Sequence, residues 1–251
     1  MSHQARKRFS QNFLVDDQIV SKIVATISPK KSDNIVEIGP GKGSLTFPLL
    51  QHLDHLSVIE IDRDLISLLK LKKQDKLTIY QADALKFDYG LISDNLRIVG
   101  NLPYNISSPL LFRLLSSKNQ IIDMTFMLQK EVVDRIVARH GSKTYGRISV
   151  MMQAFFEVES MFTVPKESFD PQPKIESAIL YLKTRTKPLT ENSKLLEKIV
   201  KISFSQRRKT LKNCLKSILS QEQTKIDLSQ RAEMLSVENF ITLMKDYEKQ
   251  N

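Results

Sequence analysis

The tetrapeptide Asn101-Leu102-Pro103-Tyr104 contains groups that could hold a nucleobase amine. The ring of Pro103 stiffens the turn and keeps Leu102 out of helical geometry, which can aim the Leu102 carbonyl outward. The Asn101 side chain offers a second acceptor near the same point, and Tyr104 offers a face on which a base can stack. Two acceptors at one point suit an amine with two hydrogens, such as that of adenine. Taken alone, the tetrapeptide is explained better as a loop with an Asx-type turn and a partly buried tyrosine.

A glycine-rich turn follows the β-rich segment 34–38. Gly39, Gly41 and Gly43 alternate with other residues there, so the backbone can turn tightly and lie against a ligand. Ser44 is expected to cap a helix beyond the turn. Glu60 lies 21 residues after Gly39, where an acid can bond both hydroxyls of a ribose. Because the third glycine comes one residue earlier than in the dinucleotide pattern, the turn favours a nucleoside without phosphates.

Asp83 follows a third β-rich segment, 77–80. An acid at that point could accept a hydrogen bond from the exocyclic amine of a purine. Alone it would be explained better as a turn or helix-capping residue. Glycines and acids at the carboxyl ends of three successive strands nevertheless point to one ligand site, because ligands of open α/β sheets bind at those ends.

The elements that must position these residues alternate between strands and helices. Expected strands, read from β-rich segments, cover 34–38, 56–61, 77–80, 97–99, 124–128, 151–164 and 177–182. Helical patterns lie between most of them, which predicts an α/β fold with a mostly parallel, doubly wound sheet and an antiparallel pair at one edge. From about residue 183 only helical patterns follow, at 195–204, 210–219 and 237–247. We therefore expect two domains, an α/β domain at 1–183 and a small all-helical domain at 184–251.

The charge balance indicates a polyanionic partner. Lys and Arg number 38 against 28 Asp and Glu, and residues 183–251 carry +7 of the net +10. Two basic clusters, Arg6-Lys7-Arg8 and Arg207-Arg208-Lys209, flank a nearly neutral body and are candidates for binding a phosphate backbone. Arg147 and Lys174 are further candidates. The alternative explanation is a solvated basic surface.

Other chemistries are disfavoured by the composition. One cysteine excludes an intrachain disulfide, and the four histidines lack the spacing of metal ligands, so no metal site is expected. No apolar run approaches the length of a membrane span, and the first residues lack the apolar core of a secretory signal. The expected compartment is the cytoplasm and the expected state a monomer.

Six segments together resemble the ribosomal RNA adenine N6-dimethyltransferases, whose cofactor is S-adenosylmethionine. In order they are Gln11-Asn12-Phe13-Leu14, Glu37-Ile38-Gly39-Pro40-Gly41-Lys42-Gly43, Glu60-Ile61-Asp62, Asp83-Ala84, Asn101-Leu102-Pro103-Tyr104 and Phe169-Asp170-Pro171-Gln172-Pro173-Lys174. The segment Phe204 to Leu211, which contains Arg207-Arg208-Lys209, is similar to the C-terminal domain of the bacterial small-subunit branch. The resemblance therefore covers nearly the whole chain.

The resemblance implies a role for each matching residue and a Rossmann-like methyltransferase sheet of seven strands. Cofactor contacts are implied for Gln11, Asn12, Leu14, Gly39, Gly41, Glu60, Ile61, Asp83, Ala84 and Asn101. Catalytic contacts with the target adenine are implied for Asn101, Leu102, Pro103, Tyr104 and Phe169, with the two aromatic rings stacking on the flipped base. The implied reaction is dimethylation of two adjacent adenines near the 3′ end of 16S rRNA in the immature 30S subunit, in support of ribosome biogenesis.

Two other functions remain open at this point. One is the large-subunit rRNA methyltransferase that confers macrolide-type resistance. The other is a ribosome- or nucleic-acid-binding factor that keeps the fold but has lost catalysis. Intact acceptors at Asn101 and Leu102 argue against the binding factor, and the Arg207-Arg208-Lys209 segment favours the small-subunit branch.

Overall fold

The computed structural model describes residues 12–72 and 74–250. Two compact units are present. Unit 1 comprises the described residues up to Val133 together with Glu159–Lys183, and unit 2 comprises 134–158 with the chain from Thr184 onward. No helix in the described ranges is long and apolar enough to cross a membrane. Predicted residues Arg6, Lys7, Arg8 and Gln11 lie outside the described part.

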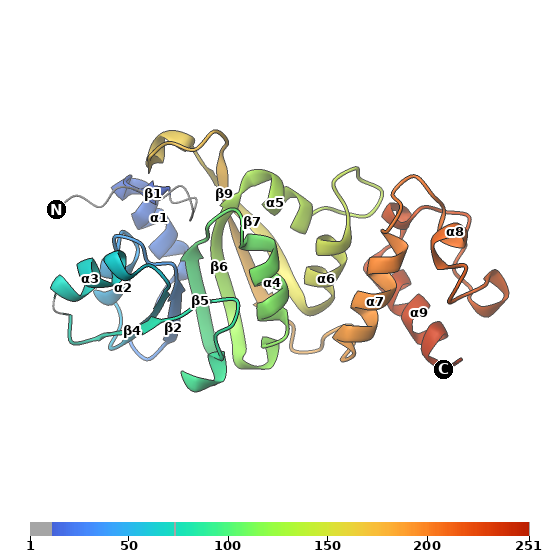
Figure 1. Ribbon diagram of the computed structural model, residues 1–251, viewed down its shortest axis with the longest axis horizontal. Coiled ribbons are helices and arrows are strands. Elements are labelled where there is room, and N and C mark those ends of the chain that lie inside the picture. The colour runs from blue at the N-terminus through green and yellow to red at the C-terminus, as the bar shows by residue number, and fades with distance from the viewer. Residues whose placement is uncertain (1–11, 73, 251) are drawn as a thin grey trace. The chain divides into compact units, whose positions relative to one another are not determined.

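Unit 1 is built on a seven-stranded sheet with the order β4-β3-β2-β5-β6-β9-β7 (Figure 1). The strands are β2 (Asn34–Ile38), β3 (Leu56–Glu60), β4 (Leu77–Gln81), β5 (Leu96–Asn101), β6 (Ile121–Gln129), β7 (Phe156–Val164) and β9 (Ser177–Thr184). Strands β2 to β6 pair in parallel, and β9 runs antiparallel to β6. The predicted α/β sheet with an antiparallel strand near one edge is confirmed.

The strand order contains a switch point between β2 and β5. The chain builds outward from β2 to β3 and β4, then returns to place β5 on the other side of β2. Loops that leave β2 and β5 at their carboxyl ends therefore diverge, and open sheets bind ligands in the crevice between such loops. The fold brings the glycine turn and the Asn101 loop to that crevice.

Helices beside the sheet are α1 (Asp17–Ile27), α2 (Thr46–Leu50), α3 (Arg63–Leu71), α4 (Ser107–Leu115) and α5 (Lys130–Ile136), the last of which continues into unit 2. A second, two-stranded sheet pairs β1 (Phe13–Leu14) with β8 (Phe169–Asp170) in antiparallel register. Its apolar side chains Leu14 and Phe169 join a core cluster that includes Val24 and Met127. The first described residues are thereby packed into unit 1.

Unit 2 is mainly helical in its described residues and also contains the start of β7 and the last residue of β9. It holds α6 (Arg147–Phe155), α7 (Ser193–Ser203), α8 (Leu211–Leu215) and α9 (Val237–Glu248), with α7 packed against the other three. The rings of Phe204 and Phe240 stack at 5.6 Å in its interior. Residues 134–158 belong to this compact unit in addition to the C-terminal region, because α6 packs on α7 and α9. The division of functions between 1–183 and 184–251 stays a prediction.

Two local predictions are wrong. Residues 151–155 belong to α6 rather than to a strand, which begins at Phe156; their side chains are buried apart from Gln153, and periodicity does not separate a buried helix from a buried strand. Ser44 does not cap α2. That helix begins at Thr46 with Leu45 at the N-cap, and the Thr46 hydroxyl donates to Glu37 instead.

Candidate active site

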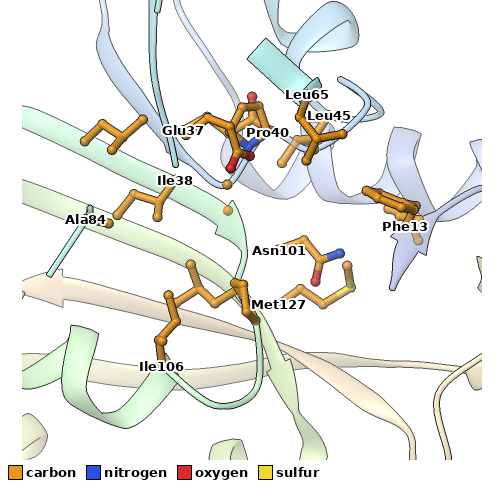
Figure 2. Close-up of a pocket in the computed structure, with 18 of the residues that line it drawn as sticks. Phe13, Glu37, Ile38, Pro40, Leu45, Leu65, Ala84, Asn101, Ile106 and Met127 are labelled. Carbon is orange, nitrogen blue, oxygen red and sulfur yellow. The ribbon is translucent and has the colours of Figure 1, made fainter. Parts of the chain in front are cut away.

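A cavity of about 330 Å³ lies at the carboxyl ends of the parallel strands of unit 1. Its size suits a nucleoside-sized ligand. The predicted residues that line it are Asn12, Leu14, Gly39, Gly41, Glu60, Ile61, Asp83, Ala84, Asn101, Leu102, Pro103 and Tyr104. Figure 2 shows the Asn101 amide beside Met127, and it shows Glu37, near the end of β2, close to Pro40 of the glycine turn. The fold thus brings five separate sequence motifs into one pocket.

The glycine turn has the backbone that its composition predicts. Gly39 and Gly41 have φ angles of +67° and +58°, in the left-handed region that residues with a Cβ rarely adopt. A Cβ added at Gly41 would lie 3.2 Å from the ring of Phe13, which packs directly against the turn. The Lys42 ammonium lies 4.4 Å from the centroid of the Phe13 ring. The turn is therefore a closely packed wall in which larger residues would intrude.

Glu60 is held at the end of β3 by backbone donors. Its Oε1 accepts hydrogen bonds from the N–H groups of Ile61 and Asp62 at 2.8 and 2.9 Å. Burial raises the pKa of the Glu60 carboxyl, while backbone N–H groups, including that of Gly41, act in the opposite direction. One carboxylate oxygen is thus fixed by the chain. The carboxylate lines the pocket, where it can also accept hydrogen bonds from paired hydroxyls.

Asp83 serves the turn and lines the cavity at once. Its Oδ1 accepts from the N–H of Leu85 at 3.0 Å, which is the turn role expected of an isolated aspartate. The side chain is half-buried at the pocket wall beside Ala84. A turn that fixes one oxygen leaves the second to accept from a ligand, so the two explanations are compatible.

The Asn101 amide has one protein partner in the described structure. Its Nδ2 donates to the backbone carbonyl of Asn12 at 3.1 Å, whereas Oδ1 accepts no hydrogen bond there. Leu102 is buried and its N–H donates to the Met127 carbonyl, which holds the loop against β6. The amide is thus held by its donor end with its acceptor end at the cavity.

Tyr104 follows in the same loop. It is half-buried, its hydroxyl bonds to the Ser177 hydroxyl at 2.9 Å, and burial raises its pKa. This bond to β9 anchors the outer end of the ring at the pocket wall, where the ring can serve as a stacking platform.

Phe169 does not line the cavity. Its ring is 4% exposed and belongs to the core cluster with Leu14 and Ile179. Its predicted stacking on the target base stays a prediction, and it requires the ring to be uncovered first.

Glu37 is a pocket residue that sequence reasoning did not single out. It is 2% exposed, and the Thr46 hydroxyl donates to its Oε2 at 2.6 Å. Burial raises the pKa of Glu37 to about 8, with a further upward contribution from the charge of Glu60. Its position inside the Glu37-to-Gly43 motif was a signal, because a buried acid next to a ligand loop is a common functional feature.

The pocket walls also contain residues that carry no sequence motif. Ile106, Met127 and Ile179 supply apolar surface, and Thr125 contributes a buried hydroxyl that has no hydrogen-bond partner among the described residues. These residues come from β6, β9 and the position just before α4, and their convergence depends on the folded sheet. Polar groups at one side and apolar surface at the other are typical of a nucleoside site.

The predicted RNA-binding residues that are described lie in different settings. Arg207, Arg208 and Lys209 are exposed, and Arg207 donates to the carbonyl of Lys143 at 2.7 Å. Lys174 is exposed in unit 1. Arg147 forms an ion pair with Glu197 and is only partly exposed. The exposure and polar contacts of these residues do not test their predicted contact with RNA, which stays a prediction.

The parallel sheet, its glycine turn and the acid at the end of β3 define a Rossmann-like methyltransferase, a class that takes S-adenosylmethionine as methyl donor. Gly41 and Glu60 fit that ligand, since the turn leaves no Cβ in its path and the carboxylate lines the pocket as an acceptor for ribose hydroxyls. Burial of two acids around the pocket suits a ligand with positive charges.

Comparison with known proteins identifies the family within that class. The family model described as ribosomal RNA adenine dimethylase matches residues 2–249. Two relatives named ribosomal RNA small subunit methyltransferase A, from Methylobacillus flagellatus and Legionella pneumophila, are each 51% identical. They cover 97% and 98% of this chain, and 98% of each relative is covered. The chain belongs to the ribosomal RNA adenine dimethylase family.

Solved structures agree with this assignment. A dimethyladenosine transferase from Plasmodium falciparum superposes with a TM-score of 0.83 at 27% identity, over 95% of this chain and 98% of that one. The 23S rRNA methyltransferase ErmE gives 0.73 at 25% identity, over 94% and 100%. The similarity in both cases extends beyond the sheet to nearly the whole chain.

Proposed function

We propose that the protein acts in the cytoplasm, where it dimethylates the N6 amines of two adjacent adenines near the 3′ end of 16S rRNA in the immature 30S subunit. The observation that carries this proposal is the Asn101 amide, whose Oδ1 is free at the pocket while its Nδ2 is bonded to the Asn12 carbonyl. An acceptor held in this way can bind an amine without first breaking a protein hydrogen bond.

Cofactor binding is assigned to the wall formed by β2, β3 and the loop after β4. Glu60 would bind the ribose hydroxyls, Asp83 the adenine amine, and Ala84 and Ile61 would lie against the ring. Ile61 is 50% exposed, and burial of this side chain under a ligand would stabilise the complex. Gly39 and Gly41 would pass the methionine portion, near the buried carboxyl of Glu37.

The bound cofactor supplies a methyl group on a sulfonium, already a strong electrophile. The target amine is the weak partner, because its lone pair is delocalised into the purine ring. Asn101 Oδ1 and the Leu102 carbonyl accept hydrogen bonds from that amine, which favours a pyramidal nitrogen and stabilises the positive charge that develops on it. These acceptors also hold the nitrogen in line for transfer. The methylated nitrogen would then release one proton to solvent water, so no side chain of this set needs to act as a general base.

The aromatic residue available to the flipped base is Tyr104. Its ring lines the pocket and its hydroxyl is fixed by Ser177, so the stacking surface exists before the base arrives. Stacking helps to offset the few kcal/mol that extrusion of a base costs. Phe169 would join it after a local rearrangement that uncovers the ring.

RNA binding is assigned mainly to unit 2. Its two segments, 134–158 and 184–251, hold eighteen Lys and Arg against ten Asp and Glu, which is most of the net charge of the chain. Arg207 donates a hydrogen bond to a backbone carbonyl of the 138–146 loop. The exposed basic segment is therefore anchored to the rest of unit 2 at this residue. Such a surface supplies phosphate contacts that position RNA without reading its sequence.

A small-subunit substrate is favoured over a large-subunit one by the sequence identity of this chain to proteins named for each. The relatives named for the small subunit are 51% identical over nearly full length, whereas the 23S rRNA methyltransferase is 25% identical. The third possibility, a binding factor without catalysis, is opposed by the unoccupied acceptor of Asn101 in an otherwise closely packed loop.

Methyl transfer to immature 30S particles tests the proposal. Particles from cells lacking this protein are incubated with the purified chain and labelled S-adenosylmethionine, and the rRNA is digested and analysed by mass spectrometry. We expect dimethylated adenine near the 3′ end of 16S rRNA, with mature 50S particles as the negative control. Label in 23S rRNA alone would assign the chain to the large subunit, and no label with intact particle binding would make it a binding factor.

A further inference from the structure

The first described residues of the chain are attached to the segment before β9 at several points. Val15 donates its N–H to the Ser168 carbonyl at 2.9 Å, and β1 pairs with β8, so that Leu14 faces Phe169. The Ser168 hydroxyl donates to Asp16 Oδ2 at 2.9 Å. Ser168 is 2% exposed and Asp16 is partly exposed, so this side-chain bond is half-buried at the edge of the core of unit 1. These segments are more than 150 residues apart in sequence.

Asp16 uses its two carboxylate oxygens for different purposes. Oδ1 accepts from the N–H groups of Gln18 and Ile19, at 3.0 and 3.2 Å, and so caps helix α1. Oδ2 is the partner of Ser168. The hydrogen bonds from Ile19 and Ser168 lower the pKa of Asp16, which is therefore ionised at neutral pH. The cap accounts for one oxygen only, so the bond to Ser168 needs a separate explanation.

The attached segment ends at the proposed catalytic amide. Asn12 precedes β1 directly, and its carbonyl accepts the Asn101 Nδ2 hydrogen bond at 3.1 Å. Because the amide group is planar, the position of Nδ2 fixes the direction of Oδ1. The placement of Asn12 therefore sets the placement of the acceptor proposed to bind the target amine. Asn12, Phe13 and Leu14 also line the cofactor side of the same cavity.

We propose that Ser168 and Asp16 are a positioning pair for methyl transfer, which holds the 12–16 segment so that the Asn12 carbonyl aims Asn101 Oδ1 into the pocket. The inference rests on the proposed function of Asn101 and deepens it. Ser168 touches neither ligand and acts through Asp16, β1 and Asn12. The same attachment joins the cofactor wall to the segment that carries Phe169, so binding of the cofactor and of the target base is coupled.

Two variants separate the pair from the helix cap. Ser168→Ala removes the buried hydroxyl and leaves the Asp16 cap intact. Asp16→Ser keeps a good N-cap residue but is too short to reach Ser168, so it removes the same bond from the other side. Asp16→Asn is the conservative variant, because Oδ1 can still cap α1 while the amide nitrogen can donate to the Ser168 oxygen. Ser21→Ala, which removes an exposed hydroxyl bonded to the Asp17 carbonyl within α1, is the matched control.

Kinetics, product composition and melting are measured together for wild type, the four single variants and the double variant that combines Ser168→Ala with Asp16→Ser. We expect Ser168→Ala and Asp16→Ser each to lower kcat about tenfold and to weaken binding of S-adenosylmethionine several-fold in calorimetry. Monomethyl adenine should accumulate, because the second transfer also needs an aimed acceptor. The double variant should be no worse than either single one, Asp16→Asn should recover most of the lost rate, and Ser21→Ala should match wild type.

A loss of folded protein alone would lower kcat without changing the KM for S-adenosylmethionine or the ratio of monomethyl to dimethyl adenine. That result, or wild-type kinetics in both Ser168→Ala and Asp16→Ser, would overturn the positioning role. Inactive wild type overturns the proposed function instead. Even then, equal affinity of wild type and Ser168→Ala for S-adenosylmethionine would count separately against the pair. If Ser168→Ala does not fold, Asp16→Ser with its preserved cap decides the question.

Discussion

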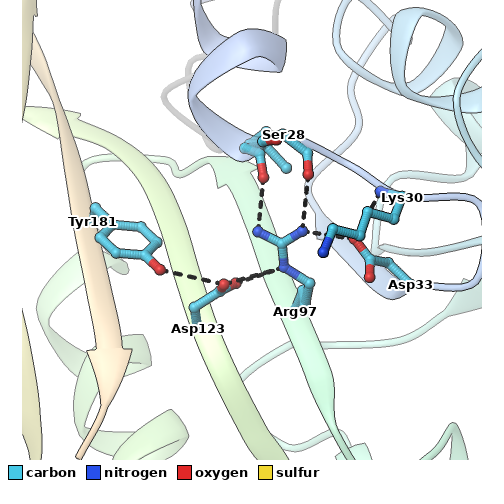
Figure 3. Close-up of polar contacts among 7 residues, drawn as sticks. Ser28, Lys30, Asp33, Arg97, Asp123 and Tyr181 are labelled. Carbon is cyan, nitrogen blue, oxygen red and sulfur yellow. Dashed lines mark hydrogen bonds and ion pairs between the residues drawn. The ribbon is translucent and has the colours of Figure 1, made fainter.

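The two ends of strand β5 carry polar side chains in opposite states. Near the amino end, Arg97 is almost fully bonded: its Nε contacts Asp123, one Nη contacts Asp33 at 2.6 Å, and the other donates to the Ile27 carbonyl at 2.7 Å (Figure 3). At the carboxyl end, the Asn101 amide has a single partner among the described residues, and its acceptor lies at the cavity. Three residues of one strand thus separate a satisfied network from an unsatisfied one.

The difference distinguishes a structural polar group from a functional one. A buried guanidinium is tolerated only when its donors are paired, and Arg97 pairs them with three separate segments of unit 1. It therefore fixes the C-terminus of α1 and the start of β2 to the centre of the sheet. A half-paired amide beside a cavity costs stability unless a ligand completes it, which makes Asn101 the functional end.

Replacement of Arg97 should give the largest effect, and it should fall on stability. Arg97→Met leaves Asp123 and Asp33 without their cation, and breaking a buried pair typically costs about 3–5 kcal/mol. Chemical denaturation measures the free energy of unfolding, with the exposed Arg63→Met as control. Affinity for S-adenosylmethionine in the folded fraction should be unchanged. A cost below about 1 kcal/mol would mean that the amino end of β5 is not a structural anchor.

Replacement of Asn101 should give the opposite profile. Asn101→Ala should lower the rate of methyl transfer about 10²–10³-fold, as expected for loss of one preorganised group at the reacting atom, while the melting temperature changes little. Binding to immature 30S particles should persist. Asn119→Ala, at an exposed position, is the control. Retained activity in the Asn101 variant would remove the functional half of the comparison.

Glu60 tests whether the carboxyl ends of neighbouring strands serve the same ligand. Glu60→Gln keeps an acceptor for the Ile61 and Asp62 N–H groups but removes the charge offered to the ribose. We expect affinity for S-adenosylmethionine to fall about tenfold or more, since hydrogen bonds to charged groups contribute roughly 1.5–3 kcal/mol. Calorimetry with the exposed Asp75→Asn as control measures it. An unchanged affinity would place the ribose elsewhere.

Glu37 should produce the smallest effect, visible as a pH dependence. Its pKa is raised to about 8 by burial, so below that pH the free protein holds the carboxyl protonated. A bound cation favours the ionised form, so binding releases a proton and affinity for S-adenosylmethionine should rise with pH and level off near 8. We expect about a threefold rise between pH 6.5 and 8 by the same linkage. In Glu37→Gln the profile should be flat; an identical slope would exclude Glu37 as its source.

Local motifs could be predicted from sequence because each depends on its own backbone. The glycine turn needs left-handed residues at Gly39 and Gly41, and the structure has them there. Glu60, Asp83 and Asn101 follow strands whose parallel arrangement was implied by the alternation of elements, which sufficed to bring them to one edge.

Helix α1 was not predicted from the sequence, although Asp16 is a typical N-cap residue and Val20, Ile23 and Ile27 mark the buried face of the helix.

Contacts between distant segments could not be predicted in the same way as the local motifs. The ion pairs of Arg97, the burial of Phe169 against Leu14 and the contact of Ser168 with Asp16 join segments far apart in the chain. Their partners become neighbours only after the sheet has formed, and no spacing in the sequence encodes them.

The most direct test of the central claim is a crystal structure of this protein with S-adenosylhomocysteine and an adenosine-containing RNA fragment. The account predicts the adenine N6 at about 3 Å from both Asn101 Oδ1 and the Leu102 carbonyl oxygen, facing the cofactor sulfur. A target amine bound to other groups, or Asn101 Oδ1 engaged by a protein donor while the base is in place, would contradict it.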